Sequence, residues 1–276
     1  MKIAVLSGKG GTGKTTVSAS LAYALQSSQY IDCDVEEPNG ALFLKPLIKH
    51  FAPVNVRVPK VDEEKCDGCG ICSRICRFNA IAVVKGKVLI FPEICHHCAA
   101  CVIGCQQNAI FEVERSIGVI EADAKGRFMQ GRLNIGEPIT LPIIKQLKQS
   151  LRSDIPVILD CSPGASCTVV QTIEGCDYCI LVTEPTPFGL HDLKIAVSLV
   201  RKMGLPFGIV INKAMQEDQT IQTYCGQHNI DILMEIPYKR EIAESYSKAM
   251  LPVHTSEDWK YKFVQMYDRI KGGRVS

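Results

Sequence analysis

The sequence lacks an excess of either charge. Lysine and arginine number 31 against 29 aspartates and glutamates, which leaves a formal net charge of +2, and no long run of one sign occurs. Nucleic-acid-binding domains carry a basic patch or stripe, and segments that lie on anionic membranes are rich in lysine and arginine. The sequence therefore indicates neither a nucleic acid nor an anionic membrane surface as a partner.

Long apolar runs are missing as well. Only a few apolar residues separate Met1 from Ser7, far fewer than the apolar core of a signal peptide needs, and no stretch approaches the ~18 apolar residues of a membrane span. There is also no internal period typical of a solenoid, apart from a twofold cysteine repeat. We expect a cytoplasmic protein with no membrane span.

Cysteine, by contrast, is abundant. The chain has 14 cysteines, and eight of them fall between Cys66 and Cys105. In a reducing compartment such a group binds metal more often than it forms disulfides. The length of 276 residues leaves room for a full α/β core and a smaller second unit.

Several short apolar runs alternate with helical patterns along most of the chain. The runs expected to be strands are 2–7, 156–160, 179–183, 207–212 and 230–236. Helical spacing of apolar residues follows the first run at 15–25 and the third at 190–200. Continuous apolar strands that alternate with helices are typical of an α/β fold with a mostly parallel sheet covered by helices on both faces.

Residues 60–113 interrupt this alternation. They contain the cysteine repeat and two short strands around a turn at 85–87, and they have no long helix. We therefore predict a discontinuous domain of residues 1–59 and 114–276, with a small α+β domain inserted at 60–113. Residues 116–138 are expected to form a β excursion that leads back to a scaffold helix beginning at Leu141.

A phosphate-binding loop follows the first predicted strand. The stretch "GKGGTGKT", from Gly8 to Thr15, fits G-x-x-x-x-G-K-[ST] and opens a helix, so its backbone N–H groups can surround phosphate oxygens. Lys14 would reach the β and γ phosphates of ATP, and the Thr15 hydroxyl would bind Mg²⁺. The predicted nucleotide-binding residues here are Gly8, Lys9, Gly10, Gly11, Thr12, Gly13, Lys14, Thr15 and Thr16.

Acidic residues follow two of the predicted strands. Asp160 ends the strand at 156–160, where it can hold the water shell of magnesium, although an acid at a strand end is often only a cap. Asp32 and Asp34 end another short strand, and one of them could orient the water that attacks the γ-phosphate.

The clustered cysteines form two runs of the pattern C-x₂-C-x₂-C-x₃-C. This pattern resembles two-cluster bacterial ferredoxins, in which the fourth cysteine of each run binds the cluster of the other run. The resemblance implies one 4Fe-4S cluster on Cys66, Cys69, Cys72 and Cys105 and a second on Cys95, Cys98, Cys101 and Cys76. The usual proline after the fourth cysteine is replaced by Arg77 and Gln106. Zinc, or a single remaining cluster, is the alternative.

The remaining cysteines, two histidines and an apolar stripe near the C-terminus are expected to have structural rather than functional roles. Cys176 and Cys179 have the spacing of a metal pair but are expected in the core, and His96 and His97 are expected to be solvated loop residues. Three further cysteines, Cys33, Cys161 and Cys167, flank the acidic segments, and a bridging cluster at a dimer interface is a minor alternative there. The apolar stripe of Trp259, Phe263, Met266 and Ile270 is expected to pack in the core rather than to touch a membrane.

The loop also resembles the deviant Walker A motif of the MinD, ParA, Mrp and nitrogenase iron protein superfamily, because Lys9 stands in "GKGGTGKTT". This resemblance implies that Lys9 crosses the interface of an ATP-dependent homodimer. It makes residues 32–39, "DCDVEEPN", switch I and residues 160–166, "DCSPGAS", switch II. The implied roles are water activation by Asp34, a position near magnesium for Asp32 and Asp160, a γ-phosphate contact by Gly164, and adenine contacts by Asn212, Pro237 and Tyr238.

Taken as a whole, the sequence resembles MinD-superfamily ATPases with an inserted ferredoxin domain, which implies ATP, Mg²⁺ and two 4Fe-4S clusters as cofactors. We expect an ATPase whose conformational switch gates electron transfer to an unidentified redox or iron-sulfur partner protein. An iron-sulfur cluster assembly or carrier ATPase resembling Mrp is the main alternative. A positioning ATPase resembling ParA or MinD is less favoured, because the sequence shows no basic face and no convincing membrane helix.

Overall fold

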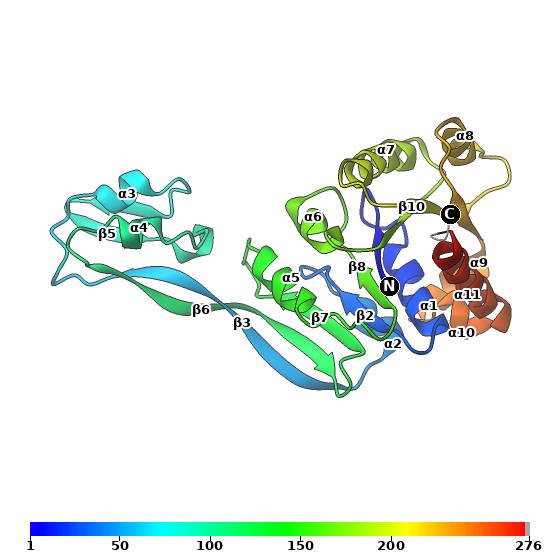
Figure 1. Ribbon diagram of the computed structural model, residues 1–276, viewed down its shortest axis with the longest axis horizontal. Coiled ribbons are helices and arrows are strands. Elements are labelled where there is room, and N and C mark those ends of the chain that lie inside the picture. Colours follow the sequence, from blue (N-terminus) through cyan, green and yellow to red (C-terminus); the bar gives the residue numbers. More distant parts are fainter. Residues whose placement is uncertain (274–276) are drawn as a thin grey trace.

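The computed structural model describes residues 1–273. It shows an α/β unit from which a long two-stranded arm carries a small lobe (Figure 1). The amino terminus begins the central strand of the α/β unit, and the last helix packs beside the first one.

Within the described residues, one nine-stranded sheet has the order β11-β10-β9-β1-β8-β2-β7-β6-β3. The strands of its parallel part are β1 (Lys2–Leu6), β2 (Gln29–Asp32), β7 (Phe128–Leu133), β8 (Val157–Asp160), β9 (Tyr178–Thr183), β10 (Phe207–Ala214) and β11 (Ile232–Pro237). Neighbours from β11 to β7 pair in parallel, and only the β7-β6 and β6-β3 pairs are antiparallel. The expectation of a mostly parallel α/β sheet is confirmed.

Helices cover both faces of this sheet and enclose two apolar cores. One face carries α1 (Lys14–Ala24), α2 (Gly40–Leu44), α9 (Arg240–Ser247), α10 (Pro252–Thr255) and α11 (Glu257–Gly272). The other carries α5 (Leu141–Lys148), α6 (Cys167–Ile173), α7 (Pro187–Lys202) and α8 (Thr220–Gln227). The stripe on α11 is buried at Phe263, Met266 and Ile270, as expected for core packing.

The arm consists of two 14-residue strands, β3 (Ile48–Val61) and β6 (Ile110–Asp123). They pair antiparallel along their whole length, and β6 then pairs with β7, so the arm is a continuation of the main sheet. β3 contains Pro53 and Pro59, which cannot donate to a ladder but are tolerated because β3 is the edge strand. Both predicted domain boundaries, 59/60 and 113/114, fall inside these continuous strands.

The lobe lies at the far end of the arm (Figure 1). It contains the hairpin β4 (Ile81–Val84) and β5 (Lys87–Ile90), the short helices α3 (Ile71–Ile75) and α4 (Ala100–Ile103), and a 3₁₀ turn, η1 (Pro92–Ile94). Its small core is made of Cys72, Ile81, Cys101 and Ile110. In residues 1–273, no helix is both long and apolar enough to cross a membrane.

Candidate functional site

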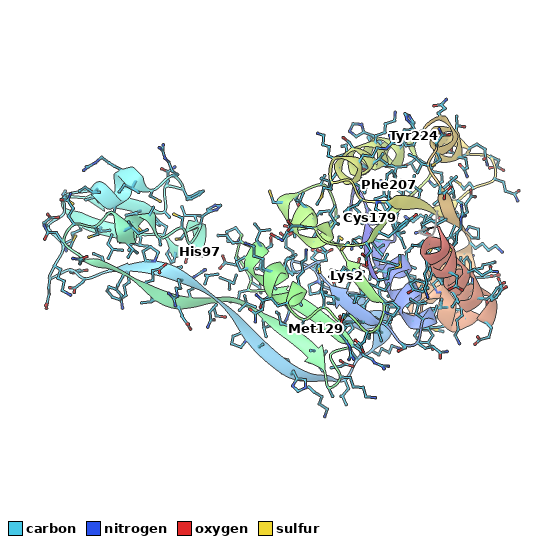
Figure 2. The ribbon with its side chains drawn as sticks, viewed as in Figure 1. Lys2, His97, Met129, Cys179, Phe207 and Tyr224 are labelled. Carbon is cyan, nitrogen blue, oxygen red and sulfur yellow. The ribbon has the colours of Figure 1, made fainter. Side chains whose placement is uncertain are left out.

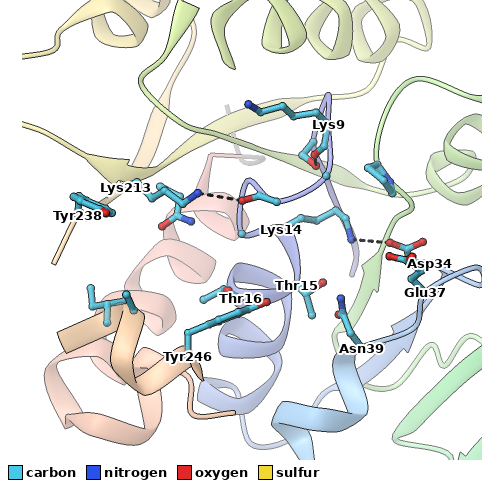
Figure 3. Close-up of a pocket in the computed structure, with 18 of the residues that line it drawn as sticks. Lys9, Lys14, Thr15, Thr16, Asp34, Glu37, Asn39, Lys213, Tyr238 and Tyr246 are labelled. Atoms are coloured by element: carbon cyan, nitrogen blue, oxygen red, sulfur yellow. Dashed lines mark hydrogen bonds and ion pairs between the residues drawn. The ribbon is translucent and has the colours of Figure 1, made fainter. Parts of the chain in front are cut away.

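A cavity of about 470 Å³ lies where the carboxyl ends of the parallel strands meet the phosphate loop (Figure 3). The residues that line it and were predicted from the sequence as site residues are Lys9, Gly10, Gly11, Gly13, Lys14, Thr15, Thr16, Asp34, Asn212, Pro237 and Tyr238. Lining residues that the sequence analysis did not single out are Ser7, Glu37, Asn39, Pro163, Lys213, Lys239, Ile242, Ala243 and Tyr246. The carboxyl edge of a parallel sheet is the usual place for a ligand site in α/β proteins.

The phosphate loop is held in shape by close backbone contacts. Gly13 has a φ of 91°, and a Cβ atom there would overlap the side-chain amide of Asn212, so only glycine fits. The Nδ2 atom of Asn212 donates to the carbonyl of Thr12 at 2.8 Å. Thr12 is buried and Gly8 packs closely on Asp192, so these two loop residues support the cavity from behind.

Lys14 is held between two acids. Its Nζ atom lies 2.6 Å from Oδ1 of Asp160 and 3.8 Å from Oδ2 of Asp34. Burial alone would lower the pKa of Lys14, but the charge of Asp160, its hydrogen bond and the charge of Asp34 outweigh it and raise that pKa. Lys14 is therefore a fixed positive charge at the loop, and its partners are one acid predicted to lie near magnesium, Asp160, and the acid predicted to activate water, Asp34.

Asp32 organises the switch I segment rather than lining the cavity. Its carboxylate accepts hydrogen bonds from the backbone N–H groups of Asp34, Asn39 and Gly40 at 2.9–3.1 Å. Burial first, and then the charge of Asp160, raise the pKa of Asp32 to about 7. Two of the predicted acids thus share one buried environment, where a bound cation would offset their repulsion.

Of the predicted site acids, Asp34 is the one that lines the cavity, where Glu37 lies beside it (Figure 3). Burial raises the pKa of Asp34 to about 6, although the charge of Lys14 opposes the shift. A carboxylate with a pKa near the working pH is suited to accept a proton from water. The role in water activation that the resemblance implies for Asp34 stays a prediction.

Lys9 is paired within its own chain. Its Nζ atom lies 2.6 Å from Oε1 of Glu184, and Figure 3 shows the side chain extending away from Lys14. Oε2 of Glu184 pairs with Lys213 at 3.0 Å, and Lys213 also donates to the carbonyl of Gly11. The sequence analysis did not single out Glu184, although its position directly after β9 was an available signal, since the other site acids also follow strands.

Gly164 is engaged as well. Its backbone N–H donates to the carbonyl of Ser7 at 2.9 Å, and its φ is 90°. To contact a γ-phosphate, switch II would have to exchange this bond for one to the nucleotide. The neighbouring Pro163 already lines the cavity.

The opposite end of the cavity has an aromatic wall. Tyr238 is 67% exposed, and Tyr246 comes from α9 and contacts the ring of Phe43 at 5.1 Å between centroids. Exposed aromatic rings beside Pro237 offer a stacking surface for a flat ligand such as a nucleobase. Phe43 lies on α2, directly after switch I.

The cysteines of the lobe are all free thiols. Cys76, Cys95, Cys98 and Cys101 line one small cavity together, so the fourth cysteine of the first run lies with the first three of the second run. The backbone N–H of His97 donates to Cys95 Sγ at 3.5 Å. Hydrogen bonds to the sulfurs are one of the means by which proteins tune iron-sulfur clusters.

The other predicted ligand set is grouped near the β4-β5 turn. Burial raises the pKa of the Cys72 thiol, and the neighbouring Cys66 and Cys69 add to this effect, so these three side chains are close together. Gly68 packs against Gly86 in the turn. The loop that carries Cys105 approaches the same region, because Gln107 Nε2 donates to Asp67 Oδ2 at 3.2 Å.

The donor chemistry of these two sets fits iron-sulfur clusters, because each set offers four free thiols and no competing oxygen ligand is needed. Within residues 1–273, no three His, Cys, Asp or Glu side chains converge closely enough to hold a single metal ion. A 4Fe-4S cubane is a wider body than one ion, and its four thiolates stand further apart.

Most of the cysteines outside the two ligand sets are buried. Cys176 and Cys179 are buried in the main core, as expected, and so are Cys33 and Cys161, whereas Cys167 is exposed at the start of α6. The expectation for His97 was wrong. It is half-buried, its Nε2 atom has no hydrogen-bond partner within the described residues, and it lies on the side of the lobe that faces the α/β unit (Figure 2).

These features define a P-loop nucleotide-binding protein. They are a glycine-rich loop between β1 and α1, the lysine Lys14 at the end of that loop, and acids at the ends of β2 and β8. Comparison with known families gives the particular group. The chain belongs to the CobQ/CobB/MinD/ParA nucleotide binding domain family, which matches residues 3–253.

Individual relatives agree with this membership. The chain is 33% identical over 262 residues to an uncharacterized protein of Methanocaldococcus jannaschii, MJ0579, covering 90% of both chains. It is 29% identical over 243 residues to a protein of Pyrococcus horikoshii named iron-sulfur cluster carrier protein, covering 85% of this chain and 67% of the relative. The solved structure of the septum site-determining protein MinD from Pyrococcus horikoshii, in complex with Mg-ADP, shares the fold with a TM-score of 0.59 at 17% identity, covering 98% and 95% of the two chains.

Proposed function

We propose that this protein is an ATP-hydrolysing iron-sulfur cluster carrier, in which residues 60–113 form an inserted ferredoxin-like domain and residues 1–59 and 114–276 form the ATPase. The proposal combines a P-loop site with two four-cysteine sets on one chain. Relatives named as iron-sulfur cluster carriers favour cluster delivery over electron transfer as the main function.

The nucleotide site has a residue for each need of phosphoryl transfer. Lys14 and the loop N–H groups bind the β and γ phosphates, and Asp34 orients the attacking water and accepts its proton. When bound, Mg²⁺ would be held by the Thr15 hydroxyl and, through water, by Asp32 and Asp160, and it would neutralise charge on the phosphates. Lys14 then exchanges its contact with Asp160 for the phosphates.

One observation carries the link between nucleotide and lobe. The backbone N–H of Leu133 in β7 donates to the carbonyl of Val35 in switch I at 2.9 Å. β7 is paired along its length with β6, the strand that forms half of the arm. A change in switch I on ATP binding therefore acts directly on the sheet that carries the lobe.

The proposal also includes a homodimer formed when ATP is bound. Lys9 would leave Glu184 and contact the phosphates of the second subunit, as the family resemblance implies. ATP supplies the four negative charges that would compete with the single carboxylate of Glu184.

The test is cluster transfer. Anaerobically prepared protein should carry about eight iron and eight sulfide ions per chain. It should restore activity to an apo-enzyme that needs a 4Fe-4S cluster, and Mg-ATP should change the transfer rate several-fold. The Lys14→Ala variant, which lacks the buried cation that would bind the phosphates, should lose the ATP effect when it is loaded equally. Transfer that is equal with and without ATP in both proteins would contradict the proposed function.

Electron transfer is the second candidate, favoured by one observation. The two cysteine sets share the small core of the lobe, through Cys72 and Cys101, and adjacent clusters are suited to passing electrons. If this function holds, reduced protein will reduce a partner while its own iron content stays constant. Loss of iron to the acceptor would instead support the carrier.

A further inference from the structure

The twofold cysteine repeat places different residues at matching positions. The runs end in "CRFNAI" and "CQQNAI", so Phe78 and Gln107 correspond to each other. After the first cysteine of each run, Asp67 corresponds to His96. A perfect repeat would have matching residues at these places, and this one does not.

In the structure, these four residues form two pairs. The rings of Phe78 and His96 are stacked, with centroids 3.8 Å apart and planes inclined by 11°. At the corresponding positions, Gln107 Nε2 donates to Asp67 Oδ2 at 3.2 Å. Each pair therefore joins the loop after one fourth cysteine to the first loop of the other run, beside the ligand set that those two loops share.

The two pairs cover their sets differently. Phe78 and His96 line the small cavity formed by Cys76, Cys95, Cys98 and Cys101, so an aromatic stack forms one side of that site, with part of both rings exposed to solvent. Two of its four cysteines are buried, whereas in the other set only Cys72 is buried.

Beside that other set, Asp67 and Gln107 are exposed like Phe78 and His96, but they are polar side chains that bind water in place of an aromatic stack. The two cysteine sets also lie in different parts of the lobe. The open set lies by the β4-β5 turn, where Gly68 packs on Gly86. The covered set adjoins His97, on the side of the lobe that faces the α/β unit (Figure 2). Burial and solvent exposure are among the factors that determine cluster properties.

We infer that the two sites are functionally unequal, with an exchangeable cluster on Cys66, Cys69, Cys72 and Cys105 and a retained cluster under the Phe78–His96 stack. This inference rests on the proposed carrier function. In transfer, four iron–thiolate bonds to this chain break and four form to the acceptor, while the acceptor's thiol protons pass to the freed cysteines. The exchange is balanced without an oxidant or a reductant.

The experiment measures iron release from the fully loaded protein to an excess of a colorimetric iron chelator under anaerobic conditions. Release should be biphasic, with half of the iron in a fast phase and half in a slow phase. Phe78→Gln, which copies the corresponding residue of the other site, should accelerate the slow phase about tenfold and leave the fast phase unchanged. Phe78→Tyr keeps the ring and should keep the slow phase.

The reciprocal variant tests the open site. Asp67→His with Gln107→Phe should slow the fast phase, because it introduces the aromatic pair. A single phase for all iron in the unaltered protein, or a slow phase that Phe78→Gln does not change, would overturn the inference while leaving the carrier function intact. Failure to load iron in either set would instead reject the proposed function itself.

Discussion

The ammonium group of Lys9 lies 2.6 Å from Oε1 of Glu184 in the same chain, and the second oxygen of Glu184 lies 3.0 Å from Lys213. Glu184 thus ties the lysine that resembles a dimer-bridging residue to a second lysine that contacts the phosphate loop. Lys9 is 35% exposed, so its pairing is only partly shielded from water, and a partner's phosphates can compete for it.

The first prediction follows from this competition. Glu184→Gln removes the carboxylate that holds Lys9, so self-association should need several-fold less ATP than in the unaltered protein. Sedimentation with ATP and the Asp34→Ala background, which blocks hydrolysis, measures this. Lys9→Ala in the same background should stay monomeric. Lys213→Ala is the matched control, because it breaks the other ion pair of Glu184 and leaves Lys9 bound. A dimer that forms equally well without Lys9 would contradict the proposed crossing.

The second prediction separates binding from hydrolysis. Lys14→Ala should abolish measurable ATP binding, because it removes the buried cation of the loop and leaves the buried Asp160 without its ion-pair partner. Asp34→Ala should bind ATP with similar affinity but hydrolyse it about 10²-fold or more slowly. Calorimetry and phosphate release measure the two effects. Equal hydrolysis by Asp34→Ala and the unaltered protein would remove Asp34 from the catalytic role.

Elements of the fold could be predicted from the sequence where a local pattern of residues specifies them. The parallel strands and the phosphate loop were predictable because buried strands are continuous apolar runs and the loop has a strict spacing. The arm was predicted only in part: the β excursion expected at 116–138 contains the second half of β6 and all of β7 and leads to α5 as expected, whereas β3 was not predicted. β3 carries Pro53 and Pro59 and many polar residues, a pattern that argues against a central strand and becomes permissible only at a sheet edge.

In the nucleotide site, too, residues that belong to a sequence motif were predicted and residues placed by tertiary contacts were not. Residues in motifs were found at the cavity, including Lys14 and Asp34, whereas Tyr246 was not. Tyr246 reaches the cavity because α9 folds back beside α2, a tertiary contact with no local pattern. His97 was misjudged for a related reason, since it lies on the side of the lobe that faces the α/β unit, within electrostatic reach of Glu137, and no local pattern indicates this proximity.

The third prediction concerns pH. The pKa of Asp34 is raised to about 6 in the folded protein, from 3.8, so the native state binds more protons than the unfolded chain between these values. Raising the pH from about 4 to 7 should therefore lower the free energy of unfolding. Asp34→Asn removes this contribution, and at pH 7.5 without nucleotide it should be more stable than the unaltered protein by about 1 kcal/mol, after allowance for solvent screening. Denaturant unfolding at pH 5 and pH 7.5 measures it, and an unchanged pH slope in the variant would contradict the assignment.

The fourth prediction tests the crossed ligand sets. Cys76 lines the cavity that contains Cys95, Cys98 and Cys101, so Cys76→Ala should remove the covered cluster and leave about four iron ions on the open set. Cys105→Ala is the mirror variant and should spare the covered cluster. Iron analysis with electron paramagnetic resonance of the reduced proteins distinguishes the two. Loss of the open cluster in Cys76→Ala would show that each run binds its own cluster.

The last prediction concerns the path between the clusters and the nucleotide. Arg115, on the arm strand β6, pairs at 2.6 Å with Glu137, whose side chain is almost completely buried, and the half-buried His97 lies within the electrostatic reach of both. Three residues after Glu137, the hydroxyl of Thr140 lies 2.9 Å from that of Thr168 on α6, the helix that follows switch II. A movement of switch II can therefore reach the loop of the covered cluster through two polar contacts.

Coupling between sites is typically about 1 to 3 kcal/mol, which for a one-electron couple corresponds to about 40 to 130 mV. Mg-ATP should thus shift a cluster potential by about this amount, or change chelator access several-fold, and cluster reduction should alter ATP affinity reciprocally. Glu137→Gln should reduce the shift by at least half while ATP binding persists. Glu114→Gln is the control, because Glu114 is an exposed carboxylate on β6, the strand that carries Arg115, and it accepts a hydrogen bond from Asn55 across the arm. Redox titration in the apo, ADP and ATP states measures the effect. Identical potentials and chelation rates in all three states of a competent ATPase would show that the lobe and the nucleotide site act independently.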